Sequence, residues 1–282
     1  DDNLVGTEAR DVIDLLGGND TYEGFGGNDN IRGQGGSDVI NGDAGNDRIF
    51  GGGGSDEVNG GADNDEINGG NGNDTLNGDA GDDLIIGKNG NDVMNGGDGE
   101  DRMNGGQGND IMSGGADNDR MSGANGDDIM DGGEGDDFVL GGDGHDILSG
   151  GAGDDILRGD SGRDTLIMDA GNDILSGEGG ADMFIFNTTN SSPLDDVVTP
   201  WTATVTDFTI FTDDLRIDGL TYGQALAAGM VNGELSSFTP TSSTTVLNTG
   251  DTIVFEGITE AEFNEYLDSF DVGPIEVPIE VF

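Results

Sequence analysis

Apolar side chains recur at a fixed interval of nine residues over most of the chain. From Gly6 to Ile185 a unit of the form Gly-Gly-x-Gly-x-Asp-x-apolar-x repeats twenty times without an inserted or deleted residue. Side chains alternate along a strand, so only the middle one of the last three places points inward. Each unit therefore predicts a glycine-rich turn followed by a three-residue strand with one core residue. These core residues are Ile13, Tyr22, Ile31, Ile40, Ile49, Val58, Ile67, Leu76, Ile85, Met94, Met103, Met112, Met121, Met130, Val139, Leu148, Leu157, Leu166, Leu175 and Phe184.

The repeat predicts a solenoid, because a fixed unit of a turn and a short strand can bury its apolar side chain only against neighbouring units. Two strands that face each other need two units, so one coil takes 18 residues and twenty units make ten coils. At the usual strand spacing the stack would be roughly 48 Å long. The run of five methionines from Met94 to Met130 falls only on inward places, which indicates core filling.

Composition narrows the classes of function. The net charge is −50 with only nine basic residues, which excludes nucleic acid as the natural partner. The chain has no cysteine, so disulfides and iron–sulfur clusters are excluded. No apolar run approaches 18 residues, and we expect no transmembrane helix. The opening Asp1-Asp2-Asn3-Leu4-Val5 lacks the basic and apolar regions of a signal peptide.

The sixth place of every unit is aspartate, which predicts a metal site in each turn. The repeat offers only oxygen ligands, from glycine carbonyls and one carboxylate, and Ca²⁺ takes six or more such oxygens. Mg²⁺ suits a stack of all-protein cages less well because it retains several waters. Zn²⁺ is disfavoured by the absence of cysteine and the single histidine. The predicted ligands are Asp11, Asp20, Asp29, Asp38, Asp47, Asp56, Asp65, Asp74, Asp83, Asp92, Asp101, Asp110, Asp119, Asp128, Asp137, Asp146, Asp155, Asp164, Asp173 and Asp182.

The stacking of units places each ion between two turns. Units on the same edge are two apart, so Asp11 should face Asp29 and Asp20 should face Asp38. Two columns of turns leave at most about 18 gaps, and we expect several Ca²⁺ ions, up to about 18. Because the core is thin and the carboxylates repel one another without the ion, we expect folding and calcium binding to be one event.

These residues resemble the RTX, or hemolysin-type, calcium-binding nonapeptide repeat. The resemblance covers residues 1–185 and implies an all-β fold, a right-handed parallel β-roll solenoid of about ten 18-residue coils. It implies that the sixth-place aspartates and the turn carbonyls bind calcium. It further implies secretion by a bacterium through type I secretion machinery, with folding after the chain reaches calcium-rich extracellular surroundings.

Some units depart from the pattern, mainly at the two ends of the array. Where a larger residue replaces a turn glycine near an end, we expect a weakened calcium site. In the interior, aspartate at the fourth place tolerates a left-handed backbone, and we expect those sites to survive. The end departures are Ala9, Leu15-Leu16 and Met168-Asp169, and the interior ones are Asp63 and Asp117.

Residues 186–282 read as a C-terminal capping region with short helices, because the period stops there and the open last coil needs a cover. Alternating patterns predict strands at Ala203–Phe208, Leu215–Ile217 and Thr252–Phe255. Capping boxes beginning at Thr221 and at Thr259 predict two short helices. These blocks look like the cap that follows RTX arrays, and the final Ile279-Glu280-Val281-Phe282 resembles a type I secretion signal or, equally, an added edge strand.

No catalytic motif stands out, so we expect the chain not to be an enzyme. The leading hypothesis is a calcium-folded extracellular module with a folding, secretion or structural role. The alternative is a targeting or adhesive module of a larger secreted enzyme or adhesin that binds extracellular polysaccharide or a cell surface. An ice-binding role is disfavoured because threonine occurs in the repeats only at Thr7, Thr21, Thr75 and Thr165. His145, at the variable fifth place, is expected to be a solvent-facing turn residue.

Overall fold

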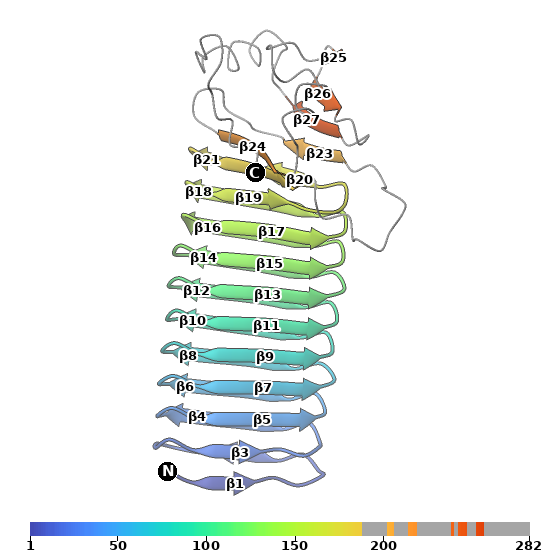
Figure 1. The fold of residues 1–282 in the computed structure, drawn as a ribbon. Helices are drawn as coiled ribbons and strands as arrows, with labels where there is room; N and C mark the ends of the chain where they lie inside the picture. The colour runs from blue at the N-terminus through green and yellow to red at the C-terminus, as the bar shows by residue number, and fades with distance from the viewer. Residues whose placement is uncertain (188–201, 206–213, 219–237, 240–241, 247–251, 257–282) are drawn as a thin grey trace.

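The chain winds into a straight stack of parallel coils, seen in a computed structural model that describes residues 1–187, 202–205, 214–218, 238–239, 242–246 and 252–256 (Figure 1). Each coil contributes one strand to each of two sheets, and residue i pairs with residue i+18, as Met94 with Met112 and Met103 with Met121. The predicted all-β parallel solenoid of about ten 18-residue coils is confirmed.

The two sheets alternate along the sequence. The 12-stranded sheet contains β1 Asn3–Val5, β3 Thr21–Glu23, β5 Val39–Ala44, β7 Glu57–Ala62, β9 Thr75–Ala80, β11 Val93–Asp98, β13 Ile111–Ala116, β15 Ile129–Glu134, β17 Ile147–Ala152, β19 Thr165–Met168, β22 Met183–Asn187 and β24 Asp214–Asp218. The 15-stranded sheet contains β2 Val12–Asp14, β4 Asn30–Gly35, β6 Arg48–Gly53, β8 Glu66–Asn71, β10 Leu84–Asn89, β12 Arg102–Gln107, β14 Arg120–Asn125, β16 Phe138–Gly144, β18 Ile156–Gly162, β20 Ile174–Ser176, β23 Thr202–Val205, β27 Thr252–Glu256, β26 Ser242–Val246 and β25 Phe238–Thr239, with β21 Gly179–Gly180 paired to β18.

The strands are longer than predicted. A typical interior strand such as β11 has six residues, and it runs from the seventh place of one unit to the third place of the next. Both its second and fourth residues are buried, so the first-place glycine points inward beside the apolar residue. The three-residue prediction was wrong because pairing continues through the glycines. The turn itself is confined to places four to six.

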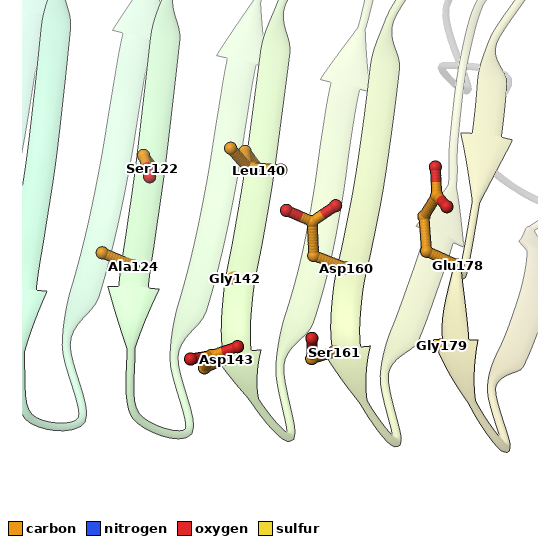
Figure 2. Close-up of a pocket in the computed structure, with 9 residues that line it drawn as sticks. All are labelled: Ser122, Ala124, Leu140, Gly142, Asp143, Asp160, Ser161, Glu178 and Gly179. Atoms are coloured by element: carbon orange, nitrogen blue, oxygen red, sulfur yellow. The ribbon is translucent and has the colours of Figure 1, made fainter.

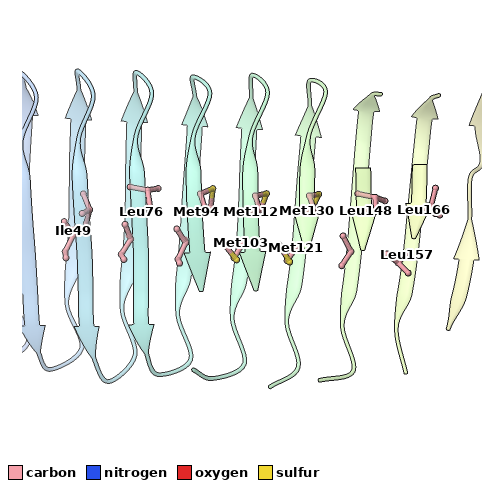
Figure 3. Packing of buried hydrophobic residues seen from close by; sticks show 14 of the residues in the cluster. Ile49, Leu76, Met94, Met103, Met112, Met121, Met130, Leu148, Leu157 and Leu166 are labelled. Carbon is pink, nitrogen blue, oxygen red and sulfur yellow. The ribbon is translucent and has the colours of Figure 1, made fainter. Parts of the chain in front are cut away.

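The core is the predicted column of single apolar residues. From Tyr22 to Phe184 every one is at most 3% exposed, and only Ile13 in the first unit is partly buried. Figure 3 shows the methionines stacked in two facing rows, with Met94, Met112 and Met130 opposite Met103 and Met121. The prediction that these methionines fill the core is confirmed.

The C-terminal strands continue the two sheets. β23 pairs in parallel with β20, and β24 pairs with β22, so these strands extend the sheets of the roll. The predicted strands at 215–217 and 252–255 lie within β24 and β27. β23 spans 202–205 and so covers the first three residues of the strand predicted over 203–208. The two predicted helices, residues 206–208 and the final Ile279–Phe282 fall outside the described residues. In the described part of the chain, no helix has the length and apolar character needed to cross a membrane.

Candidate metal centre

Each turn presents the carboxylate of its sixth-place aspartate toward the interior of the edge of the roll. The turn ends at this residue and the next strand begins directly after it, so its side chain lies on the inward side. Asp11 is half-buried. The other nineteen, from Asp20 to Asp182, are at most 4% exposed. The predicted ligand aspartates therefore form two buried columns, one along each edge of the stack.

One carboxylate oxygen is used in holding neighbouring coils together. The backbone N–H of Asp83 donates to Oδ1 of Asp101 at 2.7 Å, and the N–H of Asp101 donates to Oδ1 of Asp119 at 2.8 Å. The same bond joins successive aspartates along both columns, which fixes each side chain in one orientation. The 18-residue pairing predicted for Asp11 with Asp29 and for Asp20 with Asp38 follows this bond.

The second carboxylate oxygen is buried and receives no hydrogen bond from the described residues. A carboxylate oxygen removed from water without a compensating partner is strongly unfavourable. This arrangement recurs in eighteen turns, so it is a property of the repeat and not of one site. The oxygens are Oδ2 of Asp20, Asp29, Asp38, Asp47, Asp56, Asp65, Asp74, Asp83, Asp92, Asp101, Asp110, Asp119, Asp128, Asp137, Asp146, Asp155, Asp164 and Asp173.

The first-place glycine keeps open the space into which this oxygen points. A Cβ built on Gly96 would overlap Oδ2 of Asp101, in the same unit, and the carbonyl oxygen of Gly114, one coil later. The same overlap recurs at Gly42, Gly78 and Gly132. A carboxylate oxygen and a backbone carbonyl oxygen thus converge over a residue that has no side chain.

Burial also shifts the protonation of these carboxylates. It raises the pKa of Asp65 to about 8 and the pKa of Asp101 and Asp119 to about 7. The backbone N–H that donates to each carboxylate lowers the pKa, but by less than burial raises it. Neighbouring carboxylates raise it further. Burial and the neighbouring carboxylates therefore disfavour the charged form of these aspartates, which a cation in the turns would favour.

The donor set fits a hard divalent cation. Among the described residues there is no group of three or more His, Cys, Asp or Glu side chains placed to hold a metal. Any ion in these turns would therefore be held by one or two aspartates together with backbone carbonyls. Such an oxygen-only set, with an unpaired carboxylate oxygen in each turn, suits Ca²⁺.

The comparison with protein families agrees with this chemistry. The family model for the RTX calcium-binding nonapeptide repeat matches residues 1–24, 23–58, 50–85, 59–94, 77–112, 95–130, 104–139, 131–166 and 169–188. The chain belongs to the RTX repeat family. It carries a calcium-binding RTX module with a parallel β-roll fold. No curated protein matches the chain.

The first turn of the RTX array differs from the interior turns. Oδ2 of Asp11 accepts the N–H of Thr7 at 2.7 Å and the hydroxyl of Thr7 at 3.1 Å. The hydroxyl of Tyr22 lies in the same space, since a Cβ on Gly6 would be 2.5 Å from it and 2.8 Å from Oδ2 of Asp11. Protein groups therefore already fill the position that is open in the interior turns.

The other departures from the RTX pattern fall into two groups. Leu15 and Met168 replace first-place glycines, and both are buried in the core, 3% and 0% exposed. Their side chains take the inward direction that glycine leaves empty elsewhere. Asp63 and Asp117 adopt φ of 77° and 75°, so the expectation that fourth-place aspartate accepts the left-handed backbone is confirmed.

Sequence reasoning missed one member of the RTX ladder, Asp2. It stands nine residues before Asp11, its N–H donates to Oδ1 of Asp20 at 2.5 Å, and Asn3–Val5 after it form β1. The signal was present, because extending the nine-residue period backwards from Asp11 reaches Asp2.

The fifth place carries a second ladder that the sequence did not reveal. Its side chain accepts the N–H of the fifth-place residue one coil later, as Oδ1 of Asn91 does for Asn109 at 3.0 Å. His145 is exposed, as predicted, and it also takes part: its N–H donates to Asp127 and its Nδ1 accepts the N–H of Arg163, both at 2.9 Å. An acceptor side chain at the fifth place thus links neighbouring coils, which agrees with the frequent Asn, Asp and Ser at this place.

Proposed function

We infer that this RTX roll is a calcium-folded module of a secreted bacterial protein, which binds several ions outside the cell and becomes rigid only there. The ions supply positive charge and bind hard oxygen ligands. The sixth-place aspartates from Asp20 to Asp173 would hold them together with the first-place carbonyls. The number of ions, up to about 18, depends on how many turns match the interior ones.

The observation that carries this proposal is the repeated unpaired Oδ2 atom. Each interior turn buries a carboxylate whose second oxygen has no donor among the described residues, in a chain with a net charge of −50. One core residue per unit cannot offset that repulsion alone. A divalent cation in the turns would remove the desolvation penalty and the repulsion together, so folding would follow ion binding.

The coupling of folding to calcium binding would serve secretion. In calcium-poor surroundings the array stays unfolded by charge repulsion, a state that can pass through a type I secretion channel. Outside the cell the ions fold the roll, and folding opposes its return. The proposed signal for this route is the C-terminal tail, Ile279–Phe282.

Circular dichroism of the full chain in EDTA, and then with CaCl₂ at millimolar concentration, tests the coupling. At neutral pH we expect little β structure in EDTA and a cooperative gain with calcium, with MgCl₂ as a weaker control. Isothermal titration of the same sample counts the ions. Equal β structure in EDTA and in calcium would contradict the proposal.

A targeting or adhesive role is the second candidate, favoured by a groove on the 15-stranded sheet. The groove, about 590 Å³, crosses β14, β16, β18 and β21 (Figure 2). Its lining combines the hydroxyls of Ser122 and Ser161 with carboxylates such as Asp160, beside the apolar Leu140. Such a mixture suits a sugar, which has polar edges and an apolar ring face. Binding of neutral and acidic polysaccharides to the calcium-loaded chain tests this role, and Ser161→Trp should abolish any binding in the groove.

A further inference from the structure

The two outer faces of the roll carry opposite charge. All six Lys and Arg residues in the strands from β1 to β22 lie in the 15-stranded sheet, which has four acidic residues there and a net charge of +2. The 12-stranded sheet has no basic residue and seven acidic residues in the same range, a net charge of −7. We call these the basic face and the acidic face. The six basic residues are Arg32, Arg48, Lys88, Arg102, Arg120 and Arg158.

The middle of the basic face holds cations with no partner in the described chain. Arg102 and Arg120 stand directly opposite each other on β12 and β14, and both are exposed. Like charges in this position destabilise a sheet. Elsewhere on the same face Arg48 pairs with Glu66 at 2.9 Å, but no ion pair involves Arg102 or Arg120 among the described residues. Lys88 on β10 adds a third charge, and β10, β12 and β14 contain no acidic residue.

The acidic face carries an apolar column at the same level of the stack. Val93, Ile111, Ile129 and Ile147 follow one another in register on β11, β13, β15 and β17, each 41–50% exposed. Glu57 lies on β7, before this column along the stack, and Glu134 lies at the far end of β15, the strand that carries Ile129. A continuous exposed apolar column is typical of a surface that contacts another protein.

We propose that the basic face of one roll packs on the acidic face of a second copy of this chain. Both faces have the same strand spacing, so their side chains repeat at the same interval along the whole contact. Each face measures roughly 20 Å by 48 Å, from six-residue strands and ten coils. Two such faces would bury on the order of 1,900 Å², the size of a stable protein interface.

The geometry makes this contact heterologous, because two different surfaces meet. The acidic face of the first copy and the basic face of the second remain free, so the contact can repeat and build a row of rolls. This association between copies goes beyond the proposed function. It depends on calcium only because bound ions would cancel most of the negative charge that keeps copies apart.

Sedimentation velocity of the calcium-loaded full chain, at low and high NaCl, tests the proposal with paired charge reversals. We expect the unmodified chain to associate at low salt and to dissociate at high salt. The double variant Arg102→Glu/Arg120→Glu should associate at least roughly tenfold more weakly, because acidic residues then face acidic residues. The double variant Glu57→Lys/Glu134→Lys should weaken association for the converse reason. Mixing the two variants should restore it, because each reversed face then meets its complement.

The control is Arg10→Glu/Arg163→Glu, which makes the same change in net charge at exposed turn positions off both faces. It should associate like the unmodified chain. A calcium-loaded chain that stays monomeric at low salt, a mixture that fails to restore association, or a control as weak as the face variant would each overturn the proposal. Circular dichroism on the same samples separates this result from the proposed function, which fails only if calcium does not fold the chain.

Discussion

The first turn of the roll and a turn in its middle share the same aspartate in the same register, yet their chemistry differs. Oδ2 of Asp11 accepts two hydrogen bonds from Thr7, whereas Oδ2 of Asp101 has no donor in the described chain. The first-place residue differs at the ends as well, where Leu15 and Met168 fill the core in place of an open glycine. The first turn therefore satisfies its carboxylate with protein groups. Asp20 and Asp173, in the units of Leu15 and Met168, leave Oδ2 without a donor in the described chain, as the interior turns do.

This difference shows that the aspartate alone does not define a calcium site. Whether its second oxygen is left free for an ion or accepts a hydrogen bond from the protein depends on the second-place residue of its unit, as Thr7 shows for Asp11. A glycine at the first place leaves room for an ion between two oxygens. A threonine at the second place supplies donors that make the ion unnecessary.

The largest effect we predict is on the pH dependence of the calcium-free chain. Burial raises the pKa of Asp65 to about 8 and of Asp101 and Asp119 to about 7, from an ordinary value of 3.8. The folded state therefore binds more protons than the unfolded state between about pH 4 and pH 7. In EDTA, the roll should be most stable near pH 4 and lose stability as the pH rises to about 8.

Circular dichroism in EDTA at pH 4.5, 6 and 8 measures this dependence as a gain of β structure on acidification, and urea unfolding at pH 4.5 measures the stability of the calcium-free roll. With calcium bound, this loss of stability with rising pH should disappear, because the ion neutralises the carboxylates as the proton does. A calcium-free chain that becomes less stable on acidification in this window would contradict the difference between the first turn and the interior turns.

The next effect concerns the open space over the first-place glycine. Gly96→Ala puts a methyl group against Oδ2 of Asp101 and the carbonyl of Gly114, so it should remove at least one ion and destabilise the calcium-loaded roll by about 3 kcal/mol. Leu15→Ala is the comparison at the end of the roll. It should cost about 2–3 kcal/mol through a core cavity and leave the ion count unchanged.

Titration calorimetry and urea unfolding in calcium separate the two results. An unchanged ion count in Gly96→Ala would show that the ion does not need this space.

The sequence was sufficient to predict the repeat, the coil length and the core column, because a period of nine with one apolar place leaves few ways to bury side chains. It also predicted which aspartates share a column. It could not predict that the strands continue through the first-place glycines, because glycine has no preference for strands. Nor could it show that Thr7 and Tyr22 close the first turn, because those contacts join residues whose side chains meet only once the coils are stacked.

Replacing the aspartate itself should have opposite effects on the folded state with and without calcium. In Asp101→Asn the amide keeps the Oδ1 bond from Asp83 but removes a charged ligand, so stability in calcium should fall by about 2 kcal/mol. In EDTA at neutral pH the same change should increase the residual β structure, because a buried unpaired charge is gone. Asp11→Asn should change stability in calcium by less than about 0.5 kcal/mol and leave the β structure in EDTA unchanged.

Thermal unfolding of both variants in calcium, and circular dichroism of both in EDTA, make this comparison. If Asp11→Asn lost as much calcium-dependent stability as Asp101→Asn, the first turn would be an ordinary ion site.

The smallest effect tests the hydroxyl that enters the first turn. Tyr22 is at most 1% exposed, and its hydroxyl has no hydrogen-bond partner among the described residues. Burial, with Asp29 and Asp11 nearby, raises its pKa to about 12, so the group stays neutral at any ordinary pH. Tyr22→Phe removes an unpaired polar atom and should stabilise the roll by up to about 1 kcal/mol, equally in calcium at neutral pH and in EDTA at pH 4.5. Its ion count should equal that of the unmodified chain. Loss of one ion in this variant would make the hydroxyl a ligand and the first turn a calcium site of a different kind, whereas an unchanged count means that protein groups alone close the end of the roll.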